Sequence, residues 1–273
     1  MVPSYIENQK AGRPQDYEMK NNYLLLQRSS VAFCSAKVAW VSKLATKVPF
    51  CAVVLNTVAV VLICASCIAH GQDQFSVEAI EIAPKADVLS VDQMQHFATK
   101  GFHIKSGTRT ICELWLAKKW EIDPKFKASK ERLYPFQPGQ LIGLVHFNRK
   151  YLDFRKQTVP SGWYTLRFAL QPVDGNHEGT SIIRDFLLLL NVQQDIAEKK
   201  WDDKSLFKAS AESIGTTHPA MISLQPASDG NTPAILHNAE KEFQILHLFG
   251  NGLAGEKGQL TPLDFVVAGH APE

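Results

Sequence analysis

Apolar and polar residues alternate along several short stretches of this chain, which is the period of a β-strand with one buried face. The clearest stretch runs from Trp163 to Leu170 and follows a Pro-Ser-Gly turn. One predicted face carries Tyr164, Leu166, Phe168 and Leu170, and the other carries Trp163, Thr165, Arg167 and Ala169. Shorter patterns predict further strands at residues 102–104, 110–116, 140–147, 186–190, 221–224, 243–249 and 263–267. Residues 186–190 are apolar throughout, which predicts a strand buried on both faces.

One stretch carries a clear helical pattern. Residues Asp195 to Ile214 are charged and rich in Ala and Lys, and Gly215 supplies a C-terminal stop. A second, short helix is predicted within Asp87–Lys100. Many short strands, frequent Gly and Pro turns and one main helix predict a mainly β fold, either a β-sandwich or an open barrel with one helix.

An apolar run precedes this predicted domain. Val48 to Ala69 contains 22 residues without a charge, enough to cross a hydrocarbon layer of about 30 Å. Basic residues precede the run, so the part of the chain after it is predicted to cross the membrane. The chain therefore divides into a basic leader, residues 1–70, whose apolar run forms a signal or anchor helix, and a single exported mainly β domain, residues 71–273. The membrane is a predicted partner at least during export.

Three fates of the leader stay open. The small residues before His70 fit cleavage by a signal peptidase after Ala69, which would release the domain into the periplasm or the extracellular space. Without cleavage, residues 48–69 would remain as an anchor with the domain outside. A lipoprotein attached through Cys67 is the third alternative.

The predicted domain differs from the whole chain in net charge and in cysteine content. The whole chain has 29 basic and 27 acidic residues. Seven of the basic and three of the acidic residues lie in residues 1–70, which leaves 22 against 24, a net charge of −2, in the predicted domain. Such a near-neutral exported domain is not predicted to bind nucleic acid. Four of the five cysteines also lie in the leader, so Cys112 has no partner for an internal disulfide and is predicted to be a buried apolar residue.

A hairpin and a loop carry a resemblance to a known family. The hairpin is P-x-G-x-Y-x-L, from Pro160 to Leu166, and the loop is D-G-N-H-x-G-T, from Asp174 to Thr180. Over residues 105–248 the chain resembles an uncharacterised family of exported bacterial β-domain proteins of the planctomycete type. The resemblance implies export and a β fold, and it implies no activity.

Oxygen-bearing side chains alternate in the same loop. Asp174, Asn176 and Glu178 occupy alternate positions before Gly179, and Asp185 follows eleven residues after Asp174. This spacing matches a calcium loop, in which hard oxygen ligands converge at a sharp turn, although the strand-like flanks are not those of an EF-hand. Two interpretations stay open. Either these residues bind calcium, the one cofactor considered, or Asp174 and Asn176 cap backbone amides in a structural turn.

An enzyme alternative uses the same loop. The leading prediction has no catalytic residue, but His177 and Glu178, joined in space by His218, would form the site of a metal-assisted hydrolase. The spacing lacks the second histidine of H-E-x-x-H, because Ser181 stands at that position.

Glycines repeat near the C-terminus as G-x-G-x-x-G, from Gly250 to Gly255. A dinucleotide site requires a helix after this motif, whereas Gly258 and Pro262 interrupt the chain here. The segment is predicted to be a flexible loop between two strands.

The leading predicted function is a non-catalytic binding module or a module associated with the cell envelope. Trp120 and Trp163 are its predicted ligand-binding residues, because aromatic rings stack on sugars in carbohydrate-binding β-sandwiches. The predicted ligand is a glycan or another envelope or matrix component.

Overall fold

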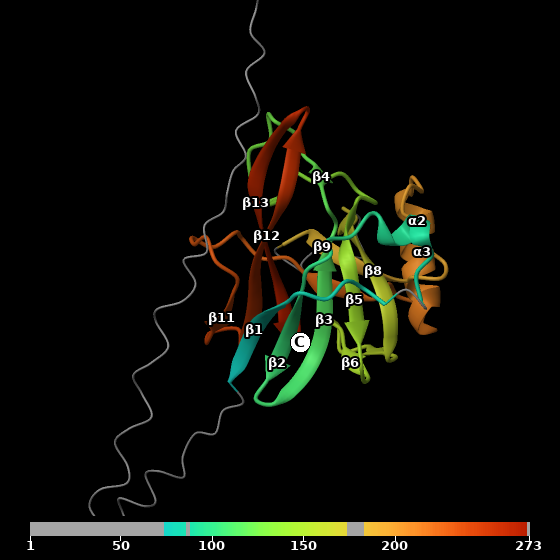
Figure 1. Ribbon diagram of the computed structural model, residues 1–273, viewed down its shortest axis with the longest axis vertical. Coiled ribbons are helices and arrows are strands. Elements are labelled where there is room, and N and C mark those ends of the chain that lie inside the picture. Colours follow the sequence, from blue (N-terminus) through green and yellow to red (C-terminus); the bar gives the residue numbers. More distant parts are fainter. Residues whose placement is uncertain (1–73, 86–87, 174–182, 272–273) are drawn as a thin grey trace, which may run out of the picture. The chain divides into compact units, whose positions relative to one another are not determined.

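Two β-sheets face each other across a shared core in the computed structural model, which describes residues 74–85, 88–173 and 183–271. The larger sheet is antiparallel throughout, curves as half of a barrel (Figure 1) and has the strand order β1-β2-β3-β5-β8-β9-β10. This architecture confirms the predicted mainly β fold of the sandwich or open-barrel kind. The strands of the larger sheet are β1 (Phe75–Ile80), β2 (Gly101–Ser106), β3 (Arg109–Leu116), β5 (Leu141–Phe147), β8 (Gly162–Leu170), β9 (Asp185–Asn191) and β10 (Met221–Ser223).

The smaller sheet is dominated by a long hairpin. Its strands are β11 (Ala234–Asn238), β12 (Phe243–Ala254) and β13 (Lys257–Ala268), and the short β4 (Trp120–Glu121) pairs in parallel with β12. Figure 1 shows this hairpin in red, extending beyond the strands of the larger sheet toward β4. A separate two-stranded ribbon consists of β6 (Tyr151–Leu152) and β7 (Thr158–Val159).

The core between the sheets confirms the predicted faces of β8. Tyr164, Leu166 and Phe168 point into this core, and Leu170 packs against it. The residues that meet them from the smaller sheet alternate along β12 and β13: Leu246, Leu248, Leu263, Phe265 and Val267. Neighbouring β9 is buried on both faces, as predicted, because its alternate leucines face either this core or a second apolar cluster that includes Leu206.

Cys112 belongs to the same core. Its side chain is 5% exposed and packs with Leu114 and Leu116, which confirms the predicted apolar role. Burial raises the pKa of the Cys112 thiol to about 12, so the reactive thiolate is strongly disfavoured.

Two helices lie on the β8 and β9 side of the larger sheet (Figure 1). The main helix, α3 (Asp203–Ile214), ends at Gly215, which has a left-handed φ of 71°, as predicted. Its predicted start at Asp195 is wrong, because Asp202 accepts a hydrogen bond from the Ser205 N–H at 3.0 Å and caps the helix there. The predicted 87–100 helix is reduced to one turn, α2 (Val91–Met94).

The β12–β13 hairpin corrects the predicted flexible loop at the C-terminal glycines. Gly250 and Gly252 lie within β12, which continues to Ala254. Each glycine makes room for a neighbouring side chain, because an added Cβ at Gly250 would overlap the Trp120 indole and one at Gly252 would overlap Thr261 Oγ1. Gly250 and Gly252 therefore serve the packing of the hairpin, whereas Gly255 lies in its turn with a left-handed φ of 66°.

The predicted leader, residues 1–70 with the apolar run 48–69, lies outside the described residues. Within the part of the chain that the structure does describe, no helix is long and apolar enough to cross a membrane.

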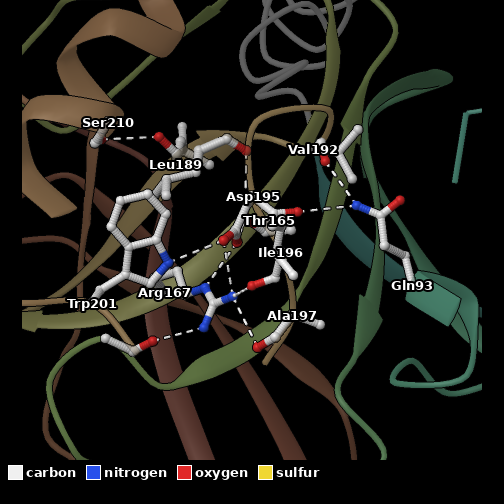
Figure 2. Close-up of polar contacts among 12 residues, drawn as sticks. Gln93, Thr165, Arg167, Leu189, Val192, Asp195, Ile196, Ala197, Trp201 and Ser210 are labelled. Carbon is white, nitrogen blue, oxygen red and sulfur yellow. Dashed lines mark hydrogen bonds and ion pairs between the residues drawn. The ribbon is translucent and has the colours of Figure 1, made fainter. Parts of the chain in front are cut away.

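A buried ion pair fixes the segment that follows β9 (Figure 2). Arg167, on the outer face of β8, is 2% exposed, and Asp195 is fully buried. Arg167 Nε donates to Asp195 Oδ2 at 2.8 Å and Nη2 donates to Oδ1 at 2.9 Å, so the pair is bidentate. Thr165 Oγ1 and Trp201 Nε1 donate to the same carboxylate at 2.6 and 3.1 Å. Both carboxylate oxygens are therefore fully engaged.

The other guanidinium donors hold backbone carbonyls on either side of the pair. Arg167 Nη1 donates to Gly139 O at 2.9 Å, and Nη2 donates to the carbonyls of residues 196–197 at 2.9 and 3.1 Å. Gln93 Nε2 of α2 adds a bond to the Asp195 carbonyl at 3.0 Å. One side chain of β8 thus ties the turn before β5 and the segment after β9 to the sheet.

Gly250→Ala is expected to lower the free energy of unfolding by about 1–3 kcal/mol, because its methyl group would overlap Trp120 in a packed core. Urea denaturation of the full-length chain measures this change. Gly258→Ala on the same hairpin is the matched control, since its Cβ would lie 3.4 Å from the nearest atom, Asn251 Oδ1. Equal stability of the two variants would contradict the packing role of Gly250.

Asp195→Ala is expected to cost about 3–5 kcal/mol of unfolding free energy, because it leaves the Arg167 charge buried without a partner. The control is Glu212→Ala, which removes the exposed partner of Lys208, 3.7 Å away, and should change stability by no more than about 0.5 kcal/mol. Chemical denaturation of both variants is the measurement. A loss for Asp195→Ala as small as the control's would show that the buried pair does not hold the fold.

Candidate functional site

Trp120, predicted to stack on a glycan, lies in the core. Its side chain is fully buried, its Nε1 donates to Ile142 O at 3.0 Å, and its ring meets Phe136 edge-on at 5.2 Å. An added Cβ at Gly250 would overlap the six-membered ring of Trp120, so the backbone of β12 lies close against the indole. Neither face of the Trp120 indole is open to a ligand, because both the hairpin and the core pack against it.

Trp163, the other predicted stacking residue, lies at the start of β8 on the outer face of the larger sheet and is half-buried. Its indole stacks on the His146 ring, with centroids 4.3 Å apart, and on the Trp115 indole, 5.4 Å away. Trp163 packs against a different cluster from the one that contains Trp120, so the fold does not bring the two tryptophans together.

Three ionisable side chains line up beside Trp163. The pairing of β2, β3, β5 and β8 places next to one another His103, Glu113, His146 and Trp163. Glu113 bridges the two histidines, since its Oε1 lies 3.2 Å from His103 Nε2 and its Oε2 lies 3.0 Å from His146 Nδ1. The three ionisable residues come from three separate strands and Trp163 comes from a fourth, so their alignment depends on the strand register, which the sequence pattern does not show.

Only one of the four predicted calcium ligands, Asp185, lies in the described part of the chain. Asp174, Asn176 and Glu178 lie outside the described residues, and the proposed calcium site therefore stays a prediction. Asp185 is fully buried at the start of β9, where its carboxylate accepts hydrogen bonds from the backbone N–H groups of residues 133–134 at 3.0 to 3.1 Å. Burial, partly offset by these bonds, raises the pKa of the Asp185 carboxyl. The structure thus gives Asp185 a role in joining the 133–134 segment to β9.

Of the three residues in the hydrolase alternative, only His218 lies in the described part of the chain. His177 and Glu178 lie outside the described residues, and His218 is exposed in the turn after α3. Within residues 74–85, 88–173 and 183–271, no group of three or more His, Cys, Asp or Glu side chains is arranged to hold a metal ion. The hydrolase interpretation therefore stays a prediction.

A polar cleft of about 270 Å³ lies where α2, β4, the start of β5 and the segment after β9 meet. Arg167 positions two of these parts through its bonds to Gly139 and to residues 196–197. The lining residues are Gln95, His96, Ala117, Lys119, Glu121, Gln140, Leu141, Ala197 and Glu198.

Backbone pairing makes the α2 side of the polar cleft rigid. The N–H of Ala98 donates to Leu116 O at 2.9 Å, and the N–H of Lys118 donates to His96 O at 2.8 Å. The chain after α2 therefore runs antiparallel to the end of β3, and it presents His96 and Gln95 from a fixed backbone.

Gln140, which lines the polar cleft, has an unpaired hydrogen-bond donor. Its Oε1 accepts a hydrogen bond from the Gln137 N–H at 3.1 Å, which fixes the orientation of the amide. The amide nitrogen, Nε2, is buried and has no hydrogen-bond partner among the described residues. Buried donors in folded proteins are nearly always paired, so this nitrogen calls for an acceptor from a ligand or from water.

The rest of the lining offers both donors and acceptors. His96 Nε2 lies 2.6 Å from Glu198 Oε1, and this pair joins two sides of the polar cleft across 102 positions of sequence. A bond from its own backbone N–H and then the bond to His96 lower the pKa of the Glu198 carboxyl, which therefore stays an acceptor. Lys119 and Glu121 add a cation and a second carboxylate, while Ala117 supplies an apolar, buried surface.

Sequence reasoning did not identify the polar cleft. Gln140 fell in a predicted strand, and His96 and Glu198 fell in two predicted helices. Their only local signal was polarity, which most surface residues share. They become a site because the ion pair of Arg167 brings the segment after β9 beside α2.

Comparisons with known protein families, with curated proteins and with solved structures find no match to this chain. Its function is therefore inferred from the chemistry of its own residues.

Proposed function

We propose that this protein is an exported, non-catalytic binding module that takes a glycan in the polar cleft. The observation that carries the proposal is made at Gln140, which lines a concave site whose walls are held by Arg167 and whose Nε2 is buried without a hydrogen-bond partner among the described residues. A ligand oxygen bonded to this nitrogen would remove the cost of leaving a donor unmet.

The mixture of polar groups supports a sugar as the ligand. A sugar hydroxyl both donates and accepts, so it pairs with amide and ammonium donors as well as with carboxylate acceptors. Gln140 and Lys119 supply the donors, and Glu121 and Glu198 supply the acceptors. Six of the nine lining residues have polar or charged side chains, which offer hydrogen bonds to a hydroxyl-rich ligand, while the apolar part of the lining can contact its carbon skeleton.

The proposed location outside the cytoplasm rests on the sequence. The uncharged run 48–69 with its basic flank supports export, followed either by release after Ala69 or by anchoring through the run itself. A glycan of the cell envelope or matrix is the ligand class that such a location supplies. Calcium bound by the Asp174–Asp185 loop would be an additional cofactor.

Gln140→Leu is expected to weaken glycan binding about two- to tenfold, the equivalent of one hydrogen bond of about 0.5–1.5 kcal/mol. Calorimetric titration of the full-length chain with a panel of soluble envelope polysaccharides first identifies the ligand and then compares the variants. The same samples are assayed for newly released reducing ends, and none are expected from a non-catalytic module.

The matched control is Gln259→Leu, which makes the same change at an exposed position of β13. This variant should bind as the unchanged chain does. Equal affinities for Gln140→Leu and Gln259→Leu would remove the polar cleft as the site. Release of reducing ends that depends on His177 or His218 would favour the hydrolase instead.

Export predicts that added protease digests the domain in spheroplasts with an intact inner membrane, because the residues after His70 would lie outside that membrane. Immunoblotting against the domain measures its survival, and a cytoplasmic marker protein that resists digestion is the control. Equal survival of the domain and the marker would rule out export.

A further inference from the structure

On the outer face of the smaller sheet, a buried histidine pairs with a buried aspartate. His247 of β12 and Asp264 of β13 are cross-strand neighbours, 2% and 0% exposed. His247 Nδ1 lies 2.7 Å from Asp264 Oδ1, so the carboxylate accepts the Nδ1 proton and fixes the imidazole tautomer. The second ring nitrogen, Nε2, is then a bare acceptor that points away from the aspartate.

That second nitrogen is buried without a partner. His247 Nε2 makes no hydrogen bond with any described residue. Gly230 covers it so closely that an added Cβ would lie 3.2 Å from the nitrogen, and Phe249 stands edge-on to the ring with centroids 4.6 Å apart. Asp264 is the only ionisable side chain that contacts His247 in the described part of the chain.

The cover over the dyad is a thin strap, residues 226–233, which runs from just after β10 to β11. Most of the strap is exposed. Among the described residues its one hydrogen bond runs from the Ser228 N–H to Asp264 Oδ2 at 3.0 Å. Gly230 has a φ of 147°, a conformation that favours glycine. The strap is thus held by the dyad itself.

We propose that the strap is a proton-controlled cover, which closes over neutral His247 and opens when His247 gains a proton. A proton on Nε2 would create a charged donor facing Gly230, with no acceptor under the closed strap. Opening the strap gives this N–H access to water and leaves the bond between Nδ1 and Asp264 intact.

The direction of the pH effect follows from linkage. The open strap binds the proton better than the closed one, so a fall in pH shifts the equilibrium toward the open form. This inference is independent of the polar cleft and of its ligand.

Hydrogen exchange of the full-length chain, followed by mass spectrometry of a peptide covering 226–233, tests the proposal. After correction for the chemical exchange rate, the Ser228 amide, the strap amide that is hydrogen-bonded to Asp264, is expected to exchange about tenfold faster at about pH 5 than at about pH 7.5. His247→Gln keeps a donor for Asp264 and cannot gain a proton. The ratio of its exchange rates at about pH 5 and about pH 7.5 should therefore fall to about one. His237→Gln, at an exposed position of β11, is the matched control and should keep the full ratio.

Gly230→Ala gives a second test that leaves the histidine in place. Its Cβ would crowd Nε2 and strain the backbone, so the Ser228 amide of the strap should exchange fast even at about pH 7.5. Peptides from β8 and β9 report whether each variant is folded. The proposal would be overturned if His247→Gln kept the full ratio of exchange rates, or if the chain without substitutions gave a ratio near one. Full protection in Gly230→Ala would also overturn it.

Discussion

The bidentate pair between Arg167 and Asp195 joins parts of the chain that local structure alone would leave apart. A buried charge is tolerated only when it is paired and its hydrogen bonds are satisfied, and here the guanidinium and the carboxylate meet both conditions. The pair sits on the outer face of β8, where an open sheet would meet water, and it holds the segment after β9 against that face. The polar cleft exists because this segment is fixed there.

Against this well-satisfied network, two buried nitrogens without partners stand out. One is Nε2 of Gln140, a residue that lines a cleft, and the other is Nε2 of His247, which lies beneath a strap. The free-energy cost of an unmet buried donor or acceptor is comparable to that of a lost hydrogen bond. Each such atom therefore indicates a hydrogen-bond partner that the chain itself does not supply. For Gln140 we infer a ligand oxygen, and for His247 a proton with access to water.

The extent of sequence-based prediction can be followed along β8. Its alternation gave both faces correctly, since a strand with period two has only two ways to present its side chains. The same pattern did not reveal that Arg167 is buried, because its partner lies 28 residues away in a segment with a helical composition. Trp120 shows the same limit. Its burial depends on Gly250, which is distant in sequence and was predicted to lie in a loop.

The sequence by itself determined the mainly β class, most strand positions and the end of α3, because these depend on short-range periodicity and on turn residues. Tertiary structure alone decided which polar residues meet. Cross-strand register aligned His103, Glu113 and His146, and one buried ion pair placed the segment with Glu198 beside His96. Hydrogen bonds and ion pairs act over a few ångströms in space, whatever the separation of the residues in sequence. The local pattern of apolar and polar residues therefore cannot predict which side chains form them.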